Sequence, residues 1–106
     1  DEPLVLNDDG DLFPSPLRDD LRPMDGIYHA TYVCARICWT MTALLNSKQL
    51  SQKENESALV RLRSNIKNFF LGHEVIKKHG KLTYTGETIM QKAYAFILTI
   101  MDEAQV

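Results

Sequence analysis

The sequence contains none of the patterns that mark the common catalytic and ligand-binding sites. It has no glycine-rich phosphate loop, no H-E-x-x-H pair and no EF-hand spacing, and its NDDGD stretch lacks the rest of a calcium loop. It also has no recognisable Ser/His/Asp or Cys/His arrangement. No apolar run approaches the roughly 18 residues that a membrane span requires. We therefore expect a protein that is not an enzyme, needs no cofactor and has no membrane span.

Proline is confined to residues 1–23, which hold all four prolines of the chain. This stretch has no helical period, and its apolar residues flank an Asp-Gly turn. A hairpin across that turn would be short and poor because Pro14 and Pro16 remove ladder donors, so we favour an extended arm. The arm is acidic. Residues 1–25 carry eight acids against two arginines, whereas the rest of the chain carries ten lysines and arginines against six acids. We expect the arm either to lie on the basic body or to face a different partner.

Length and composition predict a single globular domain. The chain has 106 residues, of which 44% are hydrophobic and 25% charged, and these are ordinary globular values. It has no signal-peptide pattern and does not begin with methionine, so we interpret it as a processed product or an excised piece. Its two cysteines fit a reducing cytosol, and they fit a processed secreted chain almost as well.

Two amphipathic helices are predicted directly after the arm. The first begins near Met24, with Asp25 as the expected N-cap, and ends near Asn46. The second begins at the capping box SQKE of residues 51–54. It ends at Gly80, after a last turn whose basic residues suit the helix dipole.

A third helix is predicted to start near Thr85, which could cap it. Its apolar residues cover more than half the circumference, which is wider than the stripe of a surface helix. We therefore expect this helix to be central in the bundle or shared with another chain. Gly72 could kink or split the second helix. The predicted fold is all-α, a three- to four-helix bundle over residues 24–106 preceded by the extended acidic arm of residues 1–23.

Cys34 and Cys38 lie in the middle of the apolar stripe of the first helix. Neighbours one turn apart have Cβ atoms about 5–6 Å apart, too far for an undistorted disulfide. Free cysteine packs as a small hydrophobe, so we expect both to be core residues. The sharper alternative is a metal site or thiol switch in which His73, on the apolar face of the second helix, is a third ligand and no fourth is evident. His73 is otherwise expected to be a satisfied core histidine.

A second, aromatic stripe on the first helix is the most informative feature. Tyr28, Tyr32 and Trp39 lie roughly 100–140° from the centre of the core stripe. Something must cover such a face, either the arm through residues such as Phe13 or a partner, because Tyr and Trp are enriched in binding hot spots. We predict that Tyr28, Tyr32 and Trp39 contact the partner or the arm, and that Phe13 of the arm is a fourth partner-binding residue.

Basic side chains on the second helix indicate a different function, nucleic-acid binding. A helix-turn-helix protein with KLTYTGE as a turn or small wing would use them, although the sequence pI of 5.9 is low for that class. The residues concerned are Arg61, Arg63, Lys67, Lys77, Lys78 and Lys81.

These observations favour a small protein-protein interaction module over the two alternatives, a nucleic-acid-binding regulator and a thiol- or metal-dependent switch. An adaptor, an inhibitor or a neutralising protein would fit, acting by occluding a partner's surface. The surplus of apolar surface on the first and third helices motivates this hypothesis. We also expect a homodimer through the third helix. The identity of the protein partner is left open.

Overall fold

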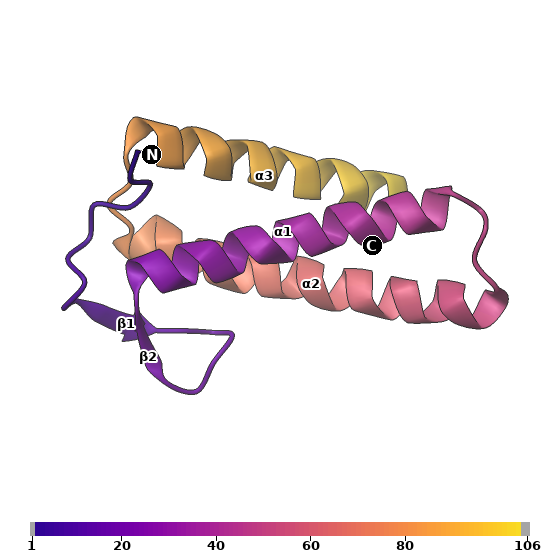
Figure 1. Cartoon of the computed structure of the whole chain (residues 1–106), viewed down its shortest axis with the longest axis horizontal. Helices are drawn as coiled ribbons and strands as arrows, with labels where there is room; N and C mark the ends of the chain where they lie inside the picture. The colour runs from indigo at the N-terminus through magenta and orange to yellow at the C-terminus, as the bar shows by residue number, and fades with distance from the viewer. Residues whose placement is uncertain (1, 105–106) are drawn as a thin grey trace.

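A computed structural model describes residues 2–104 and shows a mostly helical protein with one small sheet. Helix α1 spans Met24–Asn46, α2 spans Gln52–His79 and α3 spans Tyr84–Ala104. The three helices run along the long direction of the molecule, with α1 between the other two (Figure 1). The prediction of a helical fold is confirmed, but α1 rather than α3 occupies the central position.

The start of α1 differs from the prediction. The N-cap is Pro23, which has no side-chain capping bond and whose ring fixes φ at −66°. Asp25 lies inside the first turn, where its carboxylate faces the positive end of the helix dipole. The assignment of Asp25 as the N-cap is therefore wrong, because a proline directly before the helix already sets the backbone geometry.

Helix α2 begins and ends where the sequence predicts. The Ser51 amide donates to Glu54 Oε1 at 2.9 Å, and the Glu54 amide donates to Ser51 Oγ at 3.1 Å, which completes the capping box. Gly80 is the C-cap. The helix runs unbroken through Gly72, so the predicted kink or split does not occur. A Cβ at residue 72 would overlap the Thr31 side chain, so glycine here allows the close approach of α1 and α2.

Helix α3 is capped by Thr83 rather than Thr85. The Gly86 amide donates to Thr83 Oγ1 at 3.0 Å, as an N-cap bond requires. Thr85 lies within the first turn, and its hydroxyl donates to the Glu2 carboxylate at 2.6 Å. Thr83 and Thr85 are both typical N-cap residues, so the local sequence does not distinguish them. The path of the chain before α3 determines which of the two is the N-cap.

The core is formed by apolar side chains from all three helices. Phe69 of α2 and Ile97 of α3 are fully buried, as is Cys38 of α1. Thr31 is the buried polar exception, and its hydroxyl donates to the Ile27 carbonyl at 2.8 Å. The remaining buried members of this cluster are Met24, Ile27, Tyr28, Cys34, Ala35, Leu62, Ile66, Ile76, Met90, Ala93 and Ile100.

Residues 2–7 lie across the connection between α2 and α3. The Leu6 amide donates to the Lys81 carbonyl at 2.6 Å, and the Thr83 amide donates to the Leu4 carbonyl at 3.1 Å. Asn7 adds two bonds, from its side-chain amide to the His79 carbonyl at 2.9 Å and from the Lys81 amide to its side-chain oxygen at 2.7 Å. The start of the chain therefore closes the α2–α3 end of the bundle instead of extending into solvent.

Residues 12–23 form a hairpin that was not predicted, because the hairpin weighed against an extended arm was one across the Asp-Gly turn of residues 9–10. Strand β1, Leu12–Pro14, pairs antiparallel with β2, Leu21–Pro23, and Phe13 lies opposite Arg22. Pro14 and Pro23 occupy strand ends, where a missing amide donor costs least. The turn at Asp8–Asp11 does exist, but it does not join these two strands.

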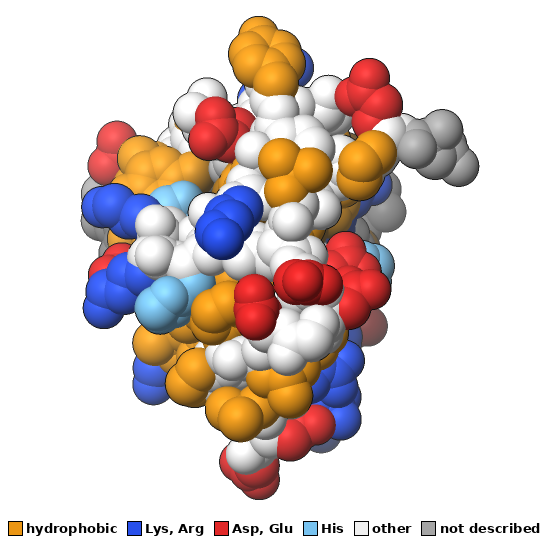
Figure 2. Space-filling view, turned by 90° about the vertical axis from the view of Figure 1, so that its left-hand side faces the viewer, with side chains coloured by type: hydrophobic (Ala, Val, Ile, Leu, Met, Phe, Trp, Pro, Cys, Tyr) orange, Lys and Arg blue, Asp and Glu red, His pale blue; other side chains and the backbone are white. Residues whose placement is uncertain are grey.

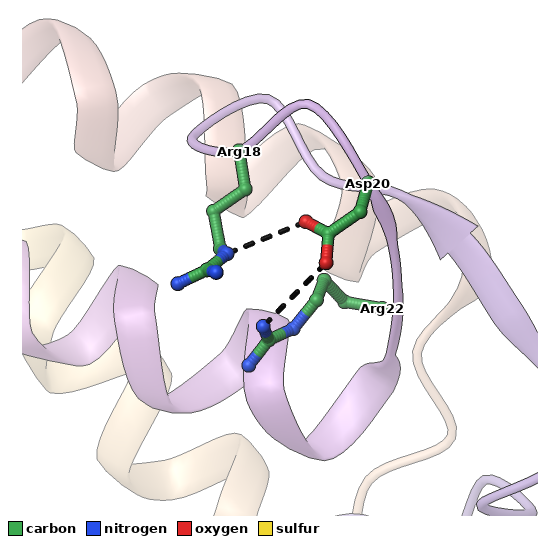
Figure 3. A network of polar contacts seen from close by, with 3 residues as sticks. All are labelled: Arg18, Asp20 and Arg22. Carbon is green, nitrogen blue, oxygen red and sulfur yellow. Dashed lines mark hydrogen bonds and ion pairs between the residues drawn. The ribbon is translucent and has the colours of Figure 1, made fainter.

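The hairpin carries a small exposed ion-pair network. Asp20 accepts from Arg18 Nε at 3.3 Å, and its other oxygen lies 3.9 Å from Arg22 Nη1 (Figure 3). Such solvent-exposed pairs contribute about 0–1 kcal/mol each to stability. Figure 2 views the end of the molecule that carries the N-terminal segment, where acidic and basic side chains are interspersed with hydrophobic ones.

None of the helices in the described part of the chain is both long and apolar enough to span a membrane.

Candidate functional site

The most distinctive surface feature is an apolar groove between α1 and α3. The hollow beside Trp39, called the main hollow below, has a volume of about 260 Å³. Of the α1 side chains that line it, Tyr32 and Trp39 belong to the aromatic stripe. On α3, Ile89, Ala93 and Phe96 come from the wide apolar face. The lining residues are Tyr32, Ala35, Arg36, Trp39, Ile89, Lys92, Ala93 and Phe96.

Small side chains form the floor of this groove. Ala35 of α1 and Ala93 of α3 are both buried and both line the hollow. Larger aromatic residues flank them, with Tyr32 and Trp39 on α1 and Phe96 on α3. A helix pair with alanines at its contact and rings on either side leaves a furrow between the rings, because the small residues cannot fill the space above themselves.

Trp39 is the most exposed aromatic side chain of the groove, with 53% of its surface accessible. The Arg36 guanidinium carbon lies 5.1 Å from the centroid of its ring, within the range of a cation–π contact. This contact orients the indole along the groove wall. A large ring held in place at the surface has little conformational entropy left to lose when a partner binds.

A second hollow of about 290 Å³ continues the groove toward the start of α1. It shares Tyr32 and Ile89 with the main hollow. Between Asp25 at one end and Trp39 at the other, fourteen residues of α1 correspond to about 21 Å of helix. The other residues that line this second hollow are Leu4, Tyr28 and His29.

Tyr28 is placed inside the protein, not on the surface. Only 3% of it is exposed, and its hydroxyl donates to the Gly86 carbonyl at 2.7 Å. Burial, with a smaller effect of neighbouring Tyr32, raises the pKa of its hydroxyl above the usual 10.0. At Tyr28, the second face of α1 is thus in contact with α3, which was not predicted from the sequence. The Tyr28 hydroxyl therefore links α1 to α3 through a hydrogen bond.

Phe13, from strand β1, stacks on the His79 ring with 5.1 Å between centroids. This contact fixes the hairpin to the end of α2. The structure thus gives Phe13 an intramolecular partner and places Tyr32 and Trp39 together in the groove.

Both cysteines are free, and both are buried on the side of α1 that packs in the core. Burial, and then the neighbouring Cys34, raises the pKa of the Cys38 thiol to about 12, and burial also raises the pKa of Cys34. Cys38 Sγ points at the Leu62 carbonyl, 3.9 Å away. Thiols of this kind are almost entirely protonated at neutral pH, whereas metal ligation and exchange chemistry need thiolate.

His73 belongs to an aromatic cluster between α2 and α3. Its ring lies 5.7 Å from Phe69 and 4.6 Å from Tyr94, centroid to centroid. Burial lowers the pKa of His73 below 6.5, Lys77 lowers it further, and Glu74 acts in the opposite direction. Among residues 2–104, no three His, Cys, Asp or Glu side chains come together in a way that could hold one metal ion.

The basic residues predicted to bind nucleic acid are all exposed on or just after α2. Arg63 and Lys67 lie one turn apart on its solvent side, whereas Arg61 points away from them. Lys78 lies 3.6 Å from Glu74. The KLTYTGE stretch forms no wing, because its first residues pair with Leu4–Leu6 and the rest begins α3.

Six residues of the main hollow were not predicted as members of a site: Ala35, Arg36, Ile89, Lys92, Ala93 and Phe96. Arg36 could have been found from its i,i+3 spacing to Trp39. The α3 residues could not, because their position over the aromatic stripe depends on how the helices pack.

No known protein-family model matches this chain, and a search of curated proteins finds no significant relative.

Proposed function

We propose that this protein is a small, non-enzymatic interaction module that acts by occupying the surface of a partner protein, as an adaptor, an inhibitor or a neutralising protein. The observation that carries the proposal is the half-exposed Trp39, held by Arg36 at the edge of an apolar groove. Hot spots of protein interfaces are enriched in Trp, Tyr and Arg beside an apolar pocket.

Burial of Trp39 on binding supplies the favourable free energy in this proposal. A large aromatic side chain that loses its remaining accessible surface gains about 25 cal/mol for each Å² of apolar area buried. Tyr32 and Phe96 extend the same apolar surface on either side. The buried Tyr28 holds α3 against α1 from below, so the groove exists before a partner arrives.

The test is partner capture with two variants of matched chemistry. Trp39→Ala removes the ring at the groove, and Val60→Ala trims an apolar side chain that is 65% exposed on α2, away from it. A partner identified by capture from the source cell is then titrated against the purified proteins. We expect Trp39→Ala to weaken binding by about tenfold or more, as hot-spot residues do, and Val60→Ala to leave it unchanged. Equal binding by wild type and Trp39→Ala contradicts the proposal.

Homodimer formation through α3 is a further part of the proposal. Leu98 is 44% exposed on this helix, on the face away from the groove lining. Sedimentation velocity over a wide concentration range tests it: a dimer that Leu98→Asp dissociates is expected, and a monomer at all concentrations contradicts it.

The second candidate function is nucleic-acid binding by the solvent side of α2. It is favoured by the one-turn spacing of exposed Arg63 and Lys67, which suits successive phosphates. Affinity for a duplex must then fall steeply with salt concentration and fall further in Arg63→Ala/Lys67→Ala. Affinity that is independent of salt eliminates this candidate.

A further inference from the structure

We infer that the groove between α1 and α3 binds an amphipathic helix that carries carboxylates beside its apolar face. The inference rests on the proposed function and adds to it the chemical class of the partner. Three features of the groove lead to it: its length, its apolar floor and the sign of the charges on its rims.

The dimensions suit a helix. The two connected hollows follow α1 over about 21 Å, which is the length of about four turns of an α-helix. Ala35 and Ala93 keep the floor low, so the side chains of a third helix can enter between Tyr32, Trp39 and Phe96. Amphipathic helices bind such grooves through apolar anchors spaced i, i+3, i+4 and i+7.

The charges select an acidic partner. Arg36 lies on the α1 rim and Lys92 on the α3 rim, and both are exposed. Within residues 2–104 neither forms an ion pair, and no carboxylate lines the main hollow. Docking an apolar or basic helix would partly desolvate two cations without compensation, whereas carboxylates on the flanks of the helix would pair with both.

The same charges also predict which end of the partner helix lies at which end of the groove. Asp25 lies at the opposite end of the groove, in the second hollow. A helix whose carboxylates meet Arg36 and Lys92 therefore places its uncharged or basic end beside Asp25. Trp39 already orients the Arg36 guanidinium, so Arg36 loses little further side-chain entropy when it binds a carboxylate.

The test uses a synthetic probe peptide about four turns long, with leucines along one face, glutamates on the two flanks of one half and uncharged residues on the flanks of the other half. A control peptide has lysine in place of each glutamate. Trp39 is the single tryptophan of the chain, so its fluorescence reports occupation of the groove directly. Anisotropy of a dye-labelled peptide gives an independent readout. We expect the acidic peptide to shift the Trp39 emission to the blue and the lysine peptide to bind about tenfold more weakly or not at all.

Charge reversal supplies the decisive comparison. Arg36→Glu/Lys92→Glu should weaken binding of the acidic peptide by about tenfold or more and should allow the lysine peptide to bind. Arg63→Glu/Lys67→Glu makes the same change of net charge on the far side of α2 and should change neither affinity by more than about twofold. All four positions are exposed, so circular dichroism should show unchanged helicity in both variants.

Each of the following results overturns the inference. One is no binding of the acidic peptide to the wild-type protein. Another is equal binding of both peptides. The third is a self-association that Trp39→Ala abolishes, which would make a second copy the occupant. If the captured partner is lost with Trp39→Ala but retained with Arg36→Glu/Lys92→Glu, the proposed function stands and the acidic helix is wrong.

Discussion

Gly72 of α2 faces Thr31 of α1 so closely that no side chain can be accommodated at residue 72. A Cβ built there would overlap the Thr31 hydroxyl and lie 3.2 Å from its methyl carbon. Thr31 is fully buried and hydrogen-bonded to its own helix, so it cannot move aside cheaply. The contact fixes the separation of α1 and α2 at a point in the first half of α1 and the last third of α2.

Gly72→Ala should therefore destabilise the protein in spite of the higher helix propensity of alanine. Overpacking at such a contact costs about 1–3 kcal/mol of unfolding free energy, which exceeds the gain of about 1 kcal/mol from replacing glycine in a helix. Gly26→Ala is the matched control. A Cβ at residue 26 meets only the Arg22 side chain, at 3.5 Å, so stability should be unchanged or slightly raised. Urea unfolding followed by circular dichroism measures both, and Thr31→Ala should recover part of the Gly72→Ala loss.

The capping box makes stability depend on pH below the usual pKa of a glutamate. The Ser51 amide, and then its hydroxyl, hold the pKa of Glu54 below 4.5. A carboxylate with a lowered folded-state pKa contributes stability that is fully present above pH 4.5 and is lost as the pH falls through the folded-state pKa. Glu54→Gln can keep the bond from the Ser51 amide but does not titrate. Its acid unfolding curve should fall less steeply than that of the wild type, and parallel curves would contradict the assignment.

His73 should produce a pH dependence at higher pH. Burial, and then Lys77, lowers its pKa, so the unfolded chain binds this proton more readily than the folded protein does. Stability is therefore complete above pH 6.5 and falls as the pH drops from there toward the lowered pKa. His73→Phe keeps a ring between Phe69 and Tyr94 and should remove this decline. NMR titration of the His73 ring protons checks the direction of the pKa shift.

The buried cysteines should resist thiol reagents in the folded protein. With the pKa of Cys38 near 12 and that of Cys34 also raised, almost no thiolate is present at pH 8. An aromatic disulfide reagent should label neither residue in buffer and both in denaturant. Rapid labelling of the folded protein, or a zinc ion that Cys34→Ala/Cys38→Ala releases, would instead support the thiol- or metal-dependent switch.

Removing the Tyr28 hydroxyl tests how much its hydrogen bond between α1 and α3 contributes to stability. Tyr28→Phe leaves the ring in place but loses the 2.7 Å bond to the Gly86 carbonyl. We expect a loss of about 1 kcal/mol in unfolding free energy, as for a typical buried hydrogen bond. Tyr32→Phe is the matched control because Tyr32 is only half-buried and lines the groove. A Tyr28→Phe variant as stable as Tyr32→Phe would show that the bond contributes nothing.

The boundaries of α1 and α2 could be predicted from the sequence because their causes are local, whereas the start of α3 at Thr83 depends on the preceding chain. Ser51 and Glu54 form reciprocal capping hydrogen bonds within the first turn of α2, and Gly80 is the C-cap directly after its last turn. The first helix is likewise found between Met24 and Asn46. The division of the chain into an arm and a bundle domain stays a prediction.

Long-range pairing could not be predicted in the same way. Leu4 to Leu6 flank an Asp-Gly turn in the sequence, yet they pair with residues 81–83, far along the chain. Nothing local distinguishes these two outcomes. The burial of Tyr28 could not be predicted for the same reason. The aromatic stripe can be recognised in the sequence, but only the packing of α3 determines that Tyr28 is covered while Trp39 is left accessible.

The bonds between residues 2–7 and the α2–α3 connection also imply an order of assembly. Their partners lie in residues 79–83, whose positions are set by the packing of α2 and α3, so we expect this segment to join after the helices. Once the helices are packed, only the short chain between Leu6 and Met24 remains to be closed, at a small entropic cost. Amides such as that of Leu6 should consequently exchange with solvent deuterium through a local opening, well before those of the core around Phe69.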